Sequence, residues 1–182
     1  SELSFSIPSG TLREFALVQR NQTLPTPKVV GDVANQDLHA LPQTDMIILA
    51  QPGLTSQAER LAETHRDRDG LSVQVVTPEV VYNEFSSGTP DATAYRRFMK
   101  MFYDRQTSES DAPKYLLLFG DGAFDNRFLT SSWQNVTTSN MLLTYQTDES
   151  LDDKSYVIDD YFGFLDDSNN GKGLLASKID IG

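Results

Sequence analysis

Three short apolar runs, separated by stretches with helical periodicity, constrain the fold of this chain more than any other feature. The runs cover residues 45–50, 71–76 and 115–119. Each has the length of a strand that is buried on both faces. A strand, a crossover helix and a second strand form a right-handed unit in which the two strands are parallel. The alternation therefore predicts an α/β fold, in which a parallel sheet carries helices on both faces.

Helix start and stop signals occur between the apolar runs. Ser56 and Glu59 have the spacing of a capping box, and Gly70 is a stop signal for the same helix. Thr77 followed by Pro78 predicts the start of a second, brief helix. A third helix is expected to start near residues 89–91, with an inward stripe of Ala92, Tyr95, Phe98, Met99 and Phe102.

The regular alternation is lost outside this central region. After Asn126, the runs 141–143, 156–165 and 174–181 predict shorter strands or a hairpin. The last five residues, 178–182, have the pattern of a strand that stops partway. We therefore expect an α/β sheet that is incomplete at its C-terminus.

The first 43 residues have a weaker pattern than the rest of the chain. Two candidate strands cover residues 14–18 and 28–30. We expect residues 1–43 to form a strand-rich lead-in and residues 44–182 to form the front part of an α/β domain.

The charge balance argues against nucleic acid and membrane partners. Lys and Arg total 15 against 26 Asp and Glu, so the formal net charge is −11. This charge repels phosphate backbones and anionic headgroups. No apolar run reaches the roughly 18 residues that a membrane-spanning helix needs, and residues 1–10 lack the order of a signal peptide. We expect no nucleic acid partner, no membrane insertion and no targeting signal within the chain.

The chain contains no cysteine, which excludes disulfides, thiolate metal sites and a cysteine nucleophile within these residues. Its two histidines, His39 and His65, have no nucleophile nearby in the sequence, so both are predicted to be structural. No Gly-x-Ser-x-Gly elbow, phosphate-binding loop or dinucleotide-binding glycine motif occurs. We therefore assign no catalytic residue.

The first candidate binding loop follows the run 115–119. Ligands of open parallel sheets bind beyond the carboxyl ends of the strands, which is where Asp121 is expected to lie. Asp121, Asp125 and Asn126 bring oxygen ligands suited to a hard cation onto one loop. A complete calcium loop would need an oxygen ligand where Ala123 stands. Alternatively, Asp121 and Asp125 accept hydrogen bonds from loop amides.

The pair Asp159 and Asp160 is the second candidate. On a strand, adjacent side chains point to opposite faces, so at most one of the two would reach a given site. Two carboxylates that share a site raise the pKa of one of them. The candidate binding residues are thus Asp121, Asp125 and Asp160, and the candidate metal ligands are Asp121, Asp125 and Asp159. The alternative for this pair is a bulge or a surface strand.

Two segments, 82–96 and 115–127, resemble the gingipain-type cysteine peptidases. The nearer resemblance is to the sortases of type IX secretion systems. Segments 155–163 and 178–182 extend the similarity, which covers roughly residues 25–182. The resemblance implies a caspase-like α/β fold and peptide-bond hydrolysis or transfer by a Cys/His pair. In the family that pair lies in segments that would follow Gly182, so no catalytic residue carries over.

The resemblance also implies a role for this chain and for its parent protein. It would be the non-catalytic front portion, residues 44–182, of an endopeptidase that processes C-terminal sorting signals. Its partners would be the remainder of its own peptidase domain and secreted protein substrates, and the parent would be exported to the cell surface or outer membrane. Asp121 and Asp160 match acidic loop positions that line the family's site or hold structural calcium.

A reading from a different class remains open at this point. The chain would then be an independent acidic α/β binding module, which takes a divalent cation or a phosphoryl group at Asp121, Asp125 and Asp160. A phosphoacceptor domain of this kind usually has a lysine at a later strand end. Neither Lys172 nor Lys178 is clearly at such a position.

Overall fold

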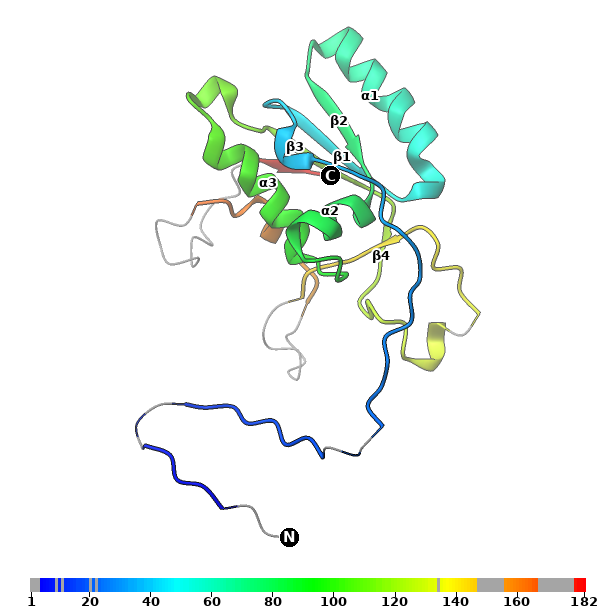
Figure 1. The fold of residues 1–182 in the computed structure, drawn as a ribbon. Helices are drawn as coiled ribbons and strands as arrows, with labels where there is room; N and C mark the ends of the chain where they lie inside the picture. Colours follow the sequence, from blue (N-terminus) through cyan, green and yellow to red (C-terminus); the bar gives the residue numbers. More distant parts are fainter. Residues whose placement is uncertain are drawn as a thin grey trace. The chain divides into compact units, whose positions relative to one another are not determined.

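A computed structural model describes residues 4–8, 10, 12–19, 21, 23–133, 135–146, 156–166 and 179–182. The chain divides into two units, Ser1–Ala34 and Asn35–Gly182. The second unit contains a parallel sheet with the strand order β2-β1-β3-β6, shown in Figure 1. Its strands are β1 (Met46–Ala50), β2 (Val73–Val76), β3 (Tyr115–Phe119) and β6 (Asp180–Ile181). The three predicted strands and their parallel pairing are therefore confirmed.

The central strand β1 is buried along its whole length. Ile48 pairs with Val75 of β2 on one side and with Leu117 of β3 on the other. Ile47 packs in one hydrophobic cluster and Ile48 in the other, because successive strand residues point to opposite faces. This two-sided burial is the reason that the strand appears in the sequence as a continuous apolar run.

Helices cover both faces of this sheet (Figure 1). Helix α1 (Thr55–Asp69) buries Ala58 and Ala62 in the same cluster as Ile48. Helices α2 (Pro78–Phe85) and α3 (Thr93–Arg105) pack on the opposite face, in the cluster that contains Ile47. The predicted fold class is confirmed.

The sequence signals located most of the helix ends. Gly70 ends α1 in the left-handed conformation with a φ of 67°, as expected from its stop signal. Pro78 begins α2 directly after Thr77. The predicted capping box is wrong, because α1 begins at Thr55 after a 3-10 turn, η2 (Pro52–Leu54). Ser56 is therefore already inside the helix and cannot cap it.

The aromatic stripe of α3 is confirmed, and it forms the centre of the larger cluster. Tyr95, Phe98 and Phe102 are each at most 1% exposed. The rings of Phe98 and Phe102 meet edge to face, with their centroids 5.2 Å apart. This stripe fixes α3 over the sheet.

The run 156–165 does not form the expected strand. It makes a single antiparallel bridge, from Val157 to Gln146, and then a 3-10 helix, η5 (Asp160–Gly163). Phe162 and Leu165 are both fully buried in the same cluster. A strand would send residues three apart to opposite faces, whereas a tight helical turn brings them to one side. The remaining strand prediction, 174–181, lies mostly outside the described residues, which contain only its end, β6.

The candidate strands at 14–18 and 28–30 are not formed. The described residues before Leu38 contain no helix or strand. Leu17, Val29 and Val30 are 85%, 89% and 97% exposed, so these apolar residues of the two predicted strands are not buried. The boundary between the two units falls after Ala34 rather than after residue 43, and a 3-10 turn, η1 (Leu38–Ala40), belongs to the second unit.

Candidate functional site

Two loops meet at the carboxyl end of β3, which is where the sequence placed a ligand crevice. Asp121 and Gly122 form a short strand, β4, which pairs in parallel with β5 (Met141–Leu142). The amide of Asp121 donates a hydrogen bond of 2.8 Å to the carbonyl oxygen of Asn140. A Cβ atom on Gly120 would lie 2.6 Å from this same oxygen, so the close approach of the two loops requires glycine at position 120.

Asn126 connects the same two loops further along. Its side-chain amide donates to the carbonyl of Thr144 at 2.8 Å, and its Oδ1 accepts from the Thr144 amide at 2.9 Å. The hydroxyl of Thr144 is buried and donates to the carbonyl of Ala123 at 2.7 Å. Asn126 therefore has a structural role. Thr144 is the second residue of this connection between the loops, and no sequence motif pointed to it.

The carboxylate of Asp125 accepts hydrogen bonds from loop amides, which is the alternative to cation binding given above. It accepts hydrogen bonds from the amides of Thr130 at 2.9 Å and Arg127 at 3.2 Å. These bonds, that of Thr130 first, lower the pKa of Asp125. Asp125 thus holds the shape of the loop from 125 to 130.

Asp121 differs from Asp125, because its side chain is exposed and lines a pocket of about 330 Å³. The other walls of this pocket include Gln57 at the start of α1, Phe119 at the end of β3 and Asn140. Of the three predicted binding residues, Asp121 alone lines this pocket. Binding of a ligand at Asp121 therefore stays a prediction.

Asp159 and Asp160 lie at the start of η5, and both are exposed. Because this segment is not a strand, the strand geometry from which opposite faces were expected does not apply to it. Partial removal from water, followed by the neighbouring charge of Asp160, raises the pKa of Asp159.

The two acidic loops contact opposite ends of one segment, residues 141–146. Asp121 pairs with Met141 at its beginning, and Val157 bridges to Gln146 at its end. Within the described part of the chain, no three ligand atoms from the predicted acidic residues come within 4.8 Å of one another. Shared metal binding by Asp121, Asp125 and Asp159, and shared ligand binding by Asp121, Asp125 and Asp160, stay predictions.

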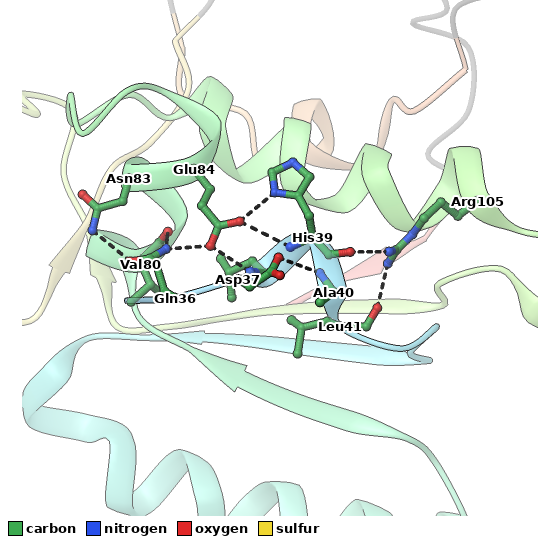
Figure 2. Close-up of polar contacts among 10 residues, drawn as sticks. Gln36, Asp37, His39, Ala40, Leu41, Val80, Asn83, Glu84 and Arg105 are labelled. Carbon is green, nitrogen blue, oxygen red and sulfur yellow. Dashed lines mark hydrogen bonds and ion pairs between the residues drawn. The ribbon is translucent and has the colours of Figure 1, made fainter. Parts of the chain in front are cut away.

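The described residues do bring together Asp37, His39 and Glu84, whose ligand atoms lie within 4.8 Å of one another (Figure 2). Glu84 accepts from the amide of Leu38 at 2.7 Å, and its Oε2 lies 2.6 Å from Nδ1 of His39. Asp37 accepts from the amide of Ala40 at 3.0 Å. These carboxylates are thus already used to cap η1. We interpret the cluster as a latch that fastens η1 to α2.

The electrostatics of Glu84 agree with this structural role. Burial opposes its ionisation, but hydrogen bonds from Gln36, Leu38 and His39 outweigh it and lower the pKa of Glu84. The His39 ring also stacks on Phe85, with ring centroids 4.7 Å apart. The sequence could not reveal this latch, because its two halves are 45 residues apart.

The second histidine is also engaged by a carboxylate. Nδ1 of His65 lies 2.6 Å from Oδ2 of Asp69, one turn later on α1. The side chain of His65 is half-buried. Both histidines therefore have the partners expected of structural residues.

Two buried tyrosines connect helices α2 and α3 to the loop that follows β5. The hydroxyls of Tyr82 on α2 and Tyr95 on α3 are hydrogen-bonded to each other. Tyr95 also accepts from the amide of Leu143 at 3.4 Å. Burial is the main cause that raises the pKa of both hydroxyls, so they remain neutral and connect the helices to the site.

The chain is similar to known peptidases in sequence and in fold. Residues 39–181 match the model of peptidase family C25. The fold is similar to the crystal structure of dimeric latent PorU from Porphyromonas gingivalis, with a TM-score of 0.74 and 44% sequence identity. That similarity covers 84% of this chain and 15% of the PorU chain, so this chain spans only a small part of PorU. No curated protein is significantly similar in sequence.

Proposed function

Because the chain belongs to peptidase family C25, we propose that it is the front portion of a sorting peptidase, which processes C-terminal signals of secreted proteins. The similarity to PorU, at 44% identity over 84% of the chain, is the observation that supports this proposal most. The resemblance to type IX secretion sortases, seen first in segments 82–96 and 115–127, supports the same assignment.

A cysteine peptidase needs a thiolate and a general base within hydrogen-bond reach of it. This chain has no cysteine, and its two histidines are held by Glu84 and Asp69. We therefore propose that the nucleophile and its histidine belong to other residues of the same protein. In this account, residues 44–182 are non-catalytic.

The contribution of this chain would be to supply one wall of the active-site region. The carboxyl ends of β1 and β3 point toward the paired loops 120–127 and 140–146, and these loops are fixed by Asn126 and Thr144. Preorganised loops of this kind position a peptide without having to order on binding. The partners implied are the rest of the peptidase domain and the secreted protein substrate.

The proposed site of action is the cell surface, where a sorting peptidase would meet its exported substrates. No helix within the described residues has the length and apolar character to cross a bilayer.

The proposal can be tested with the full-length protein. It is incubated with a peptide that carries the C-terminal region of a secreted protein, with and without iodoacetamide. We expect cleavage that iodoacetamide abolishes, and no cleavage by residues 1–182 alone. Iodoacetamide-insensitive cleavage by residues 1–182, lost in Asp121→Asn or Asp160→Asn, would contradict the proposal and favour carboxylate chemistry.

A further inference from the structure

A pocket of about 530 Å³ lies between the start of α3 and the loops that follow β3 and β5. It is lined by residues 90–93, by Asn126 and Arg127, and by residues 143–146. Its volume falls within the roughly 300–1,000 Å³ typical of ligand pockets. Among the described residues, it shares no lining side chain with the pocket of Asp121. It is therefore a separate pocket from that of Asp121, although the same two loops, 120–127 and 140–146, contribute to both.

The walls of this pocket are held in place by hydrogen bonds. At the start of α3, Oδ1 of Asp91 accepts from the amide of Thr93 at 2.8 Å. On the opposite wall, Asn126 and Thr144 exchange two hydrogen bonds of 2.8 and 2.9 Å. Walls fixed in this way lose little freedom when a ligand binds.

Two charged residues line the pocket, and they differ in how they are used. Oδ1 of Asp91 accepts a hydrogen bond from the amide of Thr93. The side chain of Arg127 is exposed, and within the described part of the chain its guanidinium makes no hydrogen bond or ion pair. Its backbone amide, however, is held by Asp125 at 3.2 Å. Among the described residues, Arg127 thus brings to the pocket a cation that no carboxylate or carbonyl engages, in a chain whose net charge is −11.

A guanidinium presents a planar set of donors that matches a carboxylate. The pocket also has apolar lining, since Ala92, Leu143 and Tyr145 contribute to its walls. Such walls suit the aliphatic part of a glutamate or aspartate side chain.

We propose that this pocket binds a carboxylate of the peptide substrate, with Arg127 as its partner. The inference rests on the proposed peptidase function, because that function makes a peptide the expected ligand. Arg127 would determine specificity and would not be a catalytic residue. The carboxylate could come from an acidic side chain or from the C-terminus of the peptide.

The test uses the full-length protein and peptides that differ only in Glu against Gln, each with a free or an amidated C-terminus. Affinity is measured by fluorescence anisotropy, and kcat/KM by cleavage. We expect the carboxylate to improve affinity about tenfold, the lower end for a charge-assisted hydrogen bond at an exposed site. Arg127→Gln should abolish this preference. Arg60→Gln, which removes an exposed arginine from α1, should keep it.

A charge-reversal variant separates the loss of a binding contact from simple misfolding of the protein. Arg127→Glu should prefer a peptide with Lys in place of Glu, a gain that misfolding cannot produce. The Glu peptides and the amidated peptides together show which carboxylate the pocket takes, and either source supports the proposal. Equal affinities in the unaltered protein, or a preference that persists in Arg127→Gln, would overturn it.

The two proposals fail in distinguishable ways. Thiol-dependent cleavage without any carboxylate preference removes only the pocket assignment. Arg127-dependent binding without thiol-dependent cleavage supports the pocket assignment and removes the peptidase function.

Discussion

Replacing Gly120 by alanine should disrupt the pairing of the two site loops. The new Cβ would lie 2.6 Å from the carbonyl oxygen of Asn140 and 3.1 Å from Cγ of Leu142. A carbon atom approaches a carbonyl oxygen to about 3.3 Å, so the 2.6 Å contact requires a shift of about 0.7 Å. Because the nearer atom belongs to the backbone, a side-chain rotation cannot relieve the contact.

The cost can be estimated from these contacts. Overpacking costs about 1–3 kcal/mol, and weakening the hydrogen bond from Asp121 to Asn140 adds about 1 kcal/mol. We expect Gly120→Ala to lower the free energy of unfolding by roughly 2–4 kcal/mol, and the melting temperature by about 5–15 °C. Urea unfolding followed by circular dichroism measures the first quantity, and calorimetry measures the second.

The matched control is Gly53→Ala, in the middle of η2. Its nearest neighbour to an added Cβ is the side-chain oxygen of Asn140 at 3.7 Å, an ordinary contact. This variant should change stability by less than about 1 kcal/mol. Equal effects of Gly120→Ala and Gly53→Ala would refute the argument that close loop approach requires glycine at position 120.

Two further predictions concern carboxylates that hold the fold together. Asp45 accepts hydrogen bonds from Lys114 and Ser72 at 2.6 Å each. Burial opposes its ionisation, but these hydrogen bonds outweigh burial and lower the pKa of Asp45. Asp45→Asn should therefore lower the free energy of unfolding by about 1–3 kcal/mol in urea at pH 7. This difference between the two proteins should be constant above the pKa that Asp45 has in the unfolded chain. It should disappear as the pH falls through the lower pKa that Asp45 has in the folded protein. Glu84→Gln should weaken the attachment of η1 to α2. Hydrogen exchange at the Leu38 amide should then accelerate more than exchange at the amides of β1. Equal acceleration at both places would argue against a local latch.

The central sheet was predictable because burial on both faces leaves a clear trace in the sequence. The segment from Met46 to Ala50 is apolar throughout, and the turn chemistry of Gly70 and Pro78 marks where helices end and begin. The pairing of β4 with β5 left no such trace. It involves two residues on each strand and depends on the absence of a side chain at Gly120.

The run 156–165 shows the limit of apolar patterns. Short apolar runs fit a strand or a helical turn equally well, and burial of Phe162 and Leu165 on one side decided for the turn. In the candidate site, Asp125 could be anticipated as a loop residue from its position before Asn126. The distance between Asp121 and the Asp159 loop could not, because it is set by the segment 141–146 that separates them.

The chain belongs to peptidase family C25, and we propose that the nucleophile of the peptidase lies in other residues of the same protein. The most direct test is to trap the full-length protein with a substrate peptide that carries a C-terminal chloromethyl ketone, and to map the adduct by mass spectrometry. We predict one adduct, on a cysteine outside residues 1–182, with loss of cleavage in proportion to labelling. Cleavage that continues after every cysteine has been blocked would contradict the claim.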